Sequence, residues 1–218
     1  VTLARRKCPE RLTTVHLREL GLEESRQLVA SLLAVERLPD PTRSHLLEKA
    51  QGNPLFLEEM VRSLIDSGLL YRQGESWRAR ADAPAASVPE SLQSLILSRV
   101  DQLQPLPRQA LQMASVLGRF FRPRVLAVMG PSNWELNDLL GQLAARSFLY
   151  VERMLPEVEY SFQHVLVRDA VYQAIPRTRR RALHRQAAQA LESLYAGNPG
   201  AVLEQIAYHY DQSEETEK

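Results

Sequence analysis

The chain has 218 residues, of which 44% are hydrophobic and 24% charged, a composition typical of one large or two modest globular domains. Its formal net charge of +1 at pH 7 excludes a general electrostatic attraction to nucleic acid or to an anionic membrane. The single cysteine, Cys8, excludes an internal disulfide and fits a reducing compartment. Because no apolar run has the length of a membrane span, we expect a cytoplasmic protein without a membrane partner.

Alternation of apolar and polar residues predicts a short strand over residues 13–20. Apolar residues at helical spacing then predict three helices, over residues 23–34, over residues 40–50, and from Pro54 to a glycine cap at Gly68. Two short strands on either side of residues 73–76 predict a β-hairpin. Residues 81–88, rich in Ala and Pro, predict a linker and a domain boundary.

A second unit follows this linker. It begins with a helix that we expect to be capped by Ser87 and Pro89. Further helices are predicted over 106–117, 122–129 and 134–146, and two strands over 148–153 and 158–162. Three helices followed by two strands are typical of a winged helix. The remaining helices, predicted over 165–174, 178–195 and 201–210, include a pair that resembles the first unit of a helical repeat. We therefore predict a mainly α protein with a short β-wing.

The sequence contains no phosphate-binding loop, no nucleophile elbow, and no His or Cys spacing suited to a metal. We interpret the paired acids Glu23-Glu24 and Glu58-Glu59 as solvated helix surface. This chain alone is therefore not expected to be an enzyme, and we assign no catalytic or metal-binding residue.

A winged helix also raises the possibility of DNA binding. The helix over residues 134–146 would lie in the major groove, yet it carries Glu135 and Asp138 against Arg146 alone. The arginines gather later, from Arg177 to Arg185, on a helix whose other face is apolar. We interpret that basic face as solvated or in contact with another domain. On this interpretation DNA is not expected as a partner, and a winged-helix transcriptional regulator is the alternative.

Several motifs occur in one order along the chain: GNPLFLEEMVRSL, VPESLQSLILSRVDQL, YSFQHVLVRDAVY, RRRALHRQAAQALE and LEQIAYHY. Together they resemble the downstream part of the STAND-class, AAA+-like ATPases. The nearest variety is the ATPase region that follows class III adenylyl or guanylyl cyclase domains in bacteria and precedes tetratricopeptide repeats. Related arrangements occur in LuxR-type regulators.

The resemblance implies a domain order and a function. Residues 1–20 would end an upstream nucleotide-binding domain, 21–82 would form a helical lid, 83–163 the winged helix, and 164–218 would lead into repeats. The parent protein would be an ATPase that controls an output domain in cis, most closely a cyclase. The upstream domain would hold ATP or ADP with Mg²⁺, and the repeats would bind protein partners.

The resemblance also implies nucleotide-binding residues. Gly52, Asn53 and Pro54 match the G-x-P motif that opens a lid helix, in which the proline packs against adenine. His164 matches the histidine of the Met-His-Asp motif, which lies near the β-phosphate of ADP. Gln163 stands at the methionine position and Val165 at the aspartate position. From the residues alone, the favoured interpretation of Pro54 is a helix starter, and that of His164 is a structural hydrogen-bonding residue. A helical protein-interaction scaffold is a further alternative function.

Overall fold

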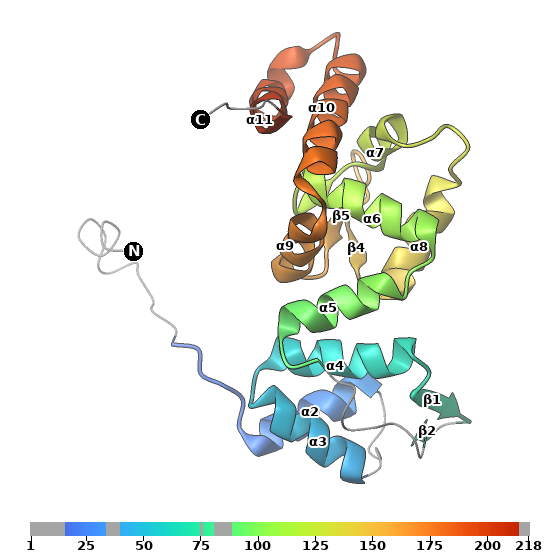
Figure 1. The fold of residues 1–218 in the computed structure, drawn as a ribbon, viewed down its shortest axis with the longest axis vertical. Coiled ribbons are helices and arrows are strands. Elements are labelled where there is room, and N and C mark those ends of the chain that lie inside the picture. Colours follow the sequence, from blue (N-terminus) through green and yellow to red (C-terminus); the bar gives the residue numbers. More distant parts are fainter. Residues whose placement is uncertain (1–15, 34–39, 75, 81–88, 214–218) are drawn as a thin grey trace, which may run out of the picture.

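The computed structural model describes residues 16–33, 40–74, 76–80 and 89–213, and these form a mainly α protein with a short β-wing (Figure 1). The first unit contains α2 (Leu22–Leu33), α3 (Asp40–Ala50) and α4 (Pro54–Asp66), followed by the hairpin of β1 (Leu70–Gln73) and β2 (Ser76–Ala79). We call this the lid unit. Its apolar core is built from one face of each helix, and the indole nitrogen of Trp77 donates to the carbonyl of Leu33 at 2.7 Å.

Helix α5 (Leu92–Asp101) follows and is shared by two cores. Figure 1 shows it between α4 on one side and α9 on the other, and it packs against both. Leu95 is buried in the core of the lid unit, whereas Ile96 and Val100 belong to the core of the following domain. Adjacent residues on one helix thus contribute to separate cores.

The winged helix is formed by α6 (Pro105–Leu117), β3 (Phe120–Phe121), α7 (Pro123–Met129), α8 (Leu136–Ala145), β4 (Leu149–Arg153) and β5 (Glu159–Phe162). Its three strands are antiparallel in the order β3-β5-β4, so β5 is central. Phe121 and Phe162 are buried and pack the sheet against the helices.

Three more helices complete the described chain: α9 (Val165–Ala174), α10 (Arg177–Leu194) and α11 (Leu203–Ser213). A short 3-10 turn, Pro199–Ala201, precedes α11, and α11 packs along α10. Their apolar residues extend the core of the winged helix without interruption. A single helix pair does not by itself define a repeat, so the tetratricopeptide prediction stays a prediction.

Two predicted elements differ from the structure, and one observed strand was not predicted. Residues 16–20 are irregular rather than a strand, and residues 13–15 and the predicted linker over 81–88 lie outside the described residues. The helix expected to be capped at Ser87 is instead capped by Ser91, whose hydroxyl accepts from the Ser94 N–H at 3.1 Å. Strand β3 was not predicted, because two residues carry no periodicity.

Within the described ranges, none of the helices is both long and apolar enough to cross a membrane.

Candidate functional site

Gly52 is held in a conformation that favours glycine, with φ of +76°. Its carbonyl accepts a hydrogen bond from the Leu20 N–H at 2.9 Å. A Cβ at position 52 would lie 2.5 Å from the carbonyl oxygen of Leu20. The close backbone approach made by this glycine is therefore to the segment that precedes the lid unit.

The next two residues begin α4 and remain exposed. The Asn53 side chain caps the helix by accepting from the Phe56 N–H at 3.1 Å, and Pro54 follows at the first helical turn. Capping accounts for Asn53 without a ligand. The exposed ring of Pro54 presents a rigid apolar surface outside the core.

A cavity of about 660 Å³ lies beside this turn, between α3, α4 and the residues before α5. Asn53 and Phe56 line it, but Pro54 does not. Its charged lining residues are Glu19, Glu48, Lys49 and Glu90. Three carboxylates against one ammonium make the interior unfavourable for phosphate groups. The charged side chains of the lining therefore do not attract a phosphate group into this cavity.

His164 is the N-cap of α9. Its Nδ1 accepts from the Leu166 N–H at 3.2 Å, and its backbone is extended. Because Nδ1 is an acceptor, the neutral ring carries its proton on Nε2. The side chain is partly buried, and no partner for Nε2 occurs among the described residues. His164 therefore caps α9 through Nδ1, and its Nε2–H has no partner among the described residues.

The structure keeps Gly52, Asn53 and Pro54 in one turn but forms no direct contact between them and His164. The start of α5 lies between the two places. Glu90 lines the cavity at Asn53, while Leu92 and Leu166 line another, of about 280 Å³, between α5 and α9.

A buried ion network joins the lid unit to the winged helix, and sequence reasoning missed it. Arg99 on α5 is fully buried and pairs with Glu59, also fully buried. Its Nε donates to Asp66 at 2.9 Å and another nitrogen to the Arg146 carbonyl at 2.6 Å, while the guanidinium stacks on Phe148. Treating Glu59 as solvated surface was therefore wrong. The sequence did contain a signal for this network, because Arg99 stands at a helical position where an apolar residue is expected.

A second polar cluster lies where α9, α10 and α11 meet. His184 and His209 are 1% and 3% exposed, and their Nδ1 atoms are 2.8 Å apart. The other ring nitrogen of His184 lies 2.9 Å from the Tyr172 hydroxyl. Burial lowers the pKa of both histidines to about 4, and for His184 the neighbouring His209, Arg168 and Arg180 add to this effect. Both rings are therefore neutral near pH 7.

The predicted basic face of α10 is partly engaged within the chain. Arg180 stacks on Tyr172, and Arg168 of α9 stacks on the same ring. Arg177, Arg179 and Arg185 are exposed. The exposed positions of α8, by contrast, are Asn137, Asp138, Gly141, Gln142 and Ala145.

Comparison with known proteins gives one family match. A family model described as a domain of unknown function (DUF8739) matches residues 21–71. The matched range begins just before α2 and ends in β1, so it includes Gly52, Asn53 and Pro54 but not His164. No curated protein matches the chain. In the described part of the chain, no group of three or more His, Cys, Asp or Glu side chains is placed to hold a metal ion.

Proposed function

We propose that this chain is the regulatory part of a STAND-class nucleotide switch, with the lid unit and the winged helix downstream of a nucleotide-binding domain. Bound ATP or ADP, with Mg²⁺ held mainly by that upstream domain, supplies the difference in free energy between a closed and an open arrangement. The output domain in cis is an adenylyl or guanylyl cyclase in cytoplasmic signalling. Protein partners bind to repeats beyond α11.

The observation that carries this proposal is the exposed ring of Pro54. Gly52 is explained by its contact with Leu20, and Asn53 by capping, whereas Pro54 at the first helical turn is exposed. A rigid apolar ring at a helix N-terminus suits a planar base on the proline and an anionic group near the helix end. The residues present therefore fit the adenine part of the nucleotide.

His164 supplies the second contact. Its Nε2–H is left to donate to a phosphate oxygen in the closed arrangement, while Nδ1 keeps α9 capped. Gly52 adds a mechanical link, because its bond to Leu20 ties the lid helix to the chain that would lead from the upstream domain. On this proposal the 218 residues alone do not hydrolyse ATP, and hydrolysis belongs to the parent protein.

The structure disfavours one alternative function and gives some support to another. A DNA-reading role is disfavoured, because the exposed positions of α8 carry one acid and no base. A protein-interaction scaffold is the second candidate. Met154 and Leu155, which are 70% and 81% exposed between β4 and β5, favour it because they leave an apolar surface on the wing.

The test uses the full-length protein, after the coding sequence upstream of Val1 has been read for a phosphate-binding loop. Absence of such a loop contradicts the proposal. Where it is present, release of fluorescent ADP is compared between wild type and His164→Asn. Asparagine retains the capping function but has no donor in the Nε2 position. Loss of a hydrogen bond to a charged group predicts release faster by about tenfold or more, with higher basal cyclase output.

Pro54→Ala is expected to weaken ADP and ATP to similar degrees, because adenine is common to both nucleotides. Gln163→Ala, at an exposed neighbouring position, is the matched control and should leave release unchanged. If His164→Asn releases ADP at the wild-type rate, His164 acts only as a helix cap.

A further inference from the structure

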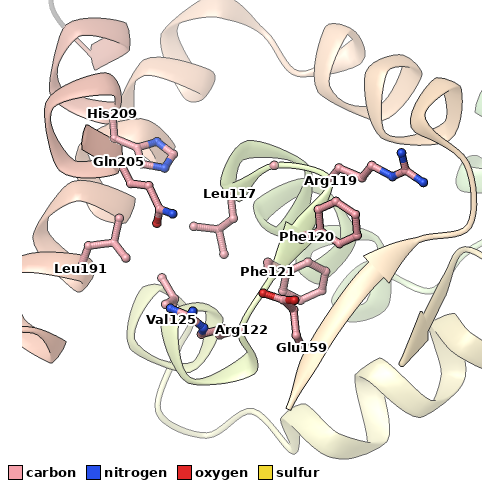
Figure 2. Close-up of a pocket in the computed structure, with 11 residues that line it drawn as sticks. Leu117, Arg119, Phe120, Phe121, Arg122, Val125, Glu159, Leu191, Gln205 and His209 are labelled. Atoms are coloured by element: carbon pink, nitrogen blue, oxygen red, sulfur yellow. The ribbon is translucent and has the colours of Figure 1, made fainter. Parts of the chain in front are cut away.

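A cavity of about 290 Å³ lies between the winged helix and the last two helices (Figure 2). Its lining is apolar at Leu117, Val125 and Leu191. Gln205 and His209, both from α11, stand together at one side, and Glu159 of β5 stands at the other. A polar end, an apolar body and an acidic far end define what such a space can bind.

His209 brings an unusual group to this cavity. The residue is 3% exposed, and its Nδ1 is occupied by His184, which in turn is hydrogen-bonded to the Tyr172 hydroxyl. Its Nε2 has no hydrogen-bond partner among the residues that the structure describes. A buried imidazole with one nitrogen unpaired at a cavity wall is well placed to hydrogen-bond a bound molecule.

Both rings are neutral near pH 7 in the free chain, so an anionic acceptor at Nε2 would bind together with a proton on His209. If His209 is protonated, Nδ1–H donates to His184, His184 donates through Nε2–H to Tyr172, and Nε2–H of His209 donates to the ligand. Every ring nitrogen is then paired. A carboxylate at Nε2 also offsets the cost of burying a positive charge on His209, and this cost keeps the ring neutral when no ligand is bound.

Other charged groups around the histidine pair determine the rest of the ligand. Arg168 of α9 and Arg180 of α10 act on His184, so they favour a negative charge nearby. Arg119 and Arg122 also line the cavity, although Arg122 is already paired with Glu157 and bonded to Tyr195. No ion-pair partner for Glu159 occurs in the described ranges. Its carboxylate disfavours a second negative charge at that end.

We propose that this cavity binds a small monocarboxylic acid with an apolar body, its carboxylate held by His209 and Gln205 and its body against Leu117, Val125 and Leu191. The ligand would touch the winged helix and α11 together, so occupancy would stabilise the contact between them. The site is independent of the nucleotide contacts proposed above, since it shares no residue with them.

The test is a calorimetric titration of the 218-residue chain with phenylacetate at about pH 6, repeated in buffers of different ionisation enthalpy. We expect saturable binding with proton uptake, because a carboxylate raises the proton affinity of His209. Phenylacetamide has the same shape without the charge and should bind about tenfold more weakly or worse. Equal binding of the two compounds, absence of proton uptake, or absence of saturable binding overturns the proposal.

Variants locate the site. Gln205→Glu changes an exposed residue at the carboxylate end, so it should abolish phenylacetate binding by repulsion while the fold is retained. Glu204→Gln, on the same helix but outside the cavity lining, should bind as wild type does. Glu159→Gln should admit glutarate, a dicarboxylate that wild type rejects. Unchanged phenylacetate binding by Gln205→Glu would place the ligand elsewhere and contradict the assignment.

Discussion

Gly52 has φ of +76°, and the Leu20 carbonyl oxygen lies 2.5 Å from the position that a Cβ would occupy. Gly68 has nearly the same φ, +69°, with nothing within 4 Å of its Cβ position. The two glycines therefore share a conformational requirement but differ in steric surroundings. Comparing them separates backbone strain from the contact with residues 16–20.

We predict that Gly68→Ala lowers the free energy of unfolding by about 1 kcal/mol, the cost of a left-handed alanine. Gly52→Ala should lower it by about 2 kcal/mol, because the Leu20 segment must also move and its hydrogen bond to Gly52 is lost. Urea denaturation of both variants measures the difference. Equal losses would show that the segment before the lid unit contributes nothing to stability.

The contact of Gly52 with Leu20 could not be predicted from the sequence, because Leu20 is distant in the chain and its segment has no regular structure. A structural hydrogen bond was one of the two roles expected for His164, but its position as the N-cap of α9 was not predicted. Ser, Thr, Asp and Asn are the usual N-caps, so a histidine does not indicate a helix start. Whether Pro54 and His164 contact a nucleotide remains a prediction.

Among the elements, helices with strong periodicity and clear caps were predicted to within a residue or two, and α9 over Val165–Ala174 matches the prediction. Helix α5 begins later than predicted because Pro89 does not start it, and Ser91 supplies the cap. The sequence also did not predict that α5 contributes to two separate cores. One amphipathic pattern does not reveal that Leu95 and Ile96 face different cores.

Helix α8 gives a prediction on DNA. Its exposed face carries Asp138 and no Lys or Arg, so the position that would enter a major groove repels phosphates. We expect the chain to bind duplex DNA only non-specifically, at micromolar or weaker affinity and with steep salt dependence. Fluorescence anisotropy with unrelated duplexes at physiological salt tests this. Sequence-selective submicromolar binding would revive the regulator hypothesis.

The junction of α9, α10 and α11 gives a prediction on pH. His184 and His209 have pKa values lowered to about 4 in the folded chain, whereas unfolded histidines titrate near 6.5. Between these values the unfolded state binds more protons, so stability is fully present above pH 6.5 and is lost as pH falls toward 4.

The loss by pH 4 should be on the order of 3 kcal/mol for each histidine, because each pKa is lowered from 6.5 to about 4. Urea denaturation across this window, compared with a variant carrying His184→Gln and His209→Gln, measures it. A wild-type curve parallel to that of the double variant would show that the pair does not control the pH dependence.

At the scale of the whole molecule, the described residues form two apolar cores, one in the lid unit and one that runs from the winged helix through α10 and α11. Arg99 lies between them and bonds to both sides, to Glu59 and Asp66 of α4 and to the Arg146 carbonyl after α8. The mainly α class and the β-wing were predicted from the sequence and are confirmed. The buried ion network around Arg99 was not predicted, because an arginine within an amphipathic helix is ordinarily a surface residue.

The buried ion network gives a prediction on how the molecule unfolds. In the described part of the chain, Arg99→Ala leaves the buried Glu59 carboxylate with Arg62 as its one cationic partner, at 3.0 Å. We therefore expect the free energy of unfolding to fall by about 3–5 kcal/mol. Because the two cores also lose their polar connection, a single calorimetric transition should separate into two, with the lid unit melting first. Arg26→Ala, in an exposed pair with Glu23, is the control and should change stability by less than about 1 kcal/mol.

A double variant tests the cause of that loss. Arg99→Met with Glu59→Leu removes both buried charges and keeps comparable volume, so it should recover most of the stability that Arg99→Ala loses. Recovery of stability with two transitions remaining would mean that the ion network, rather than apolar packing around α5, makes the two cores unfold together. A single transition in Arg99→Ala would mean that Leu95 and Ile96 are sufficient to couple them, and the network would then have no coupling role.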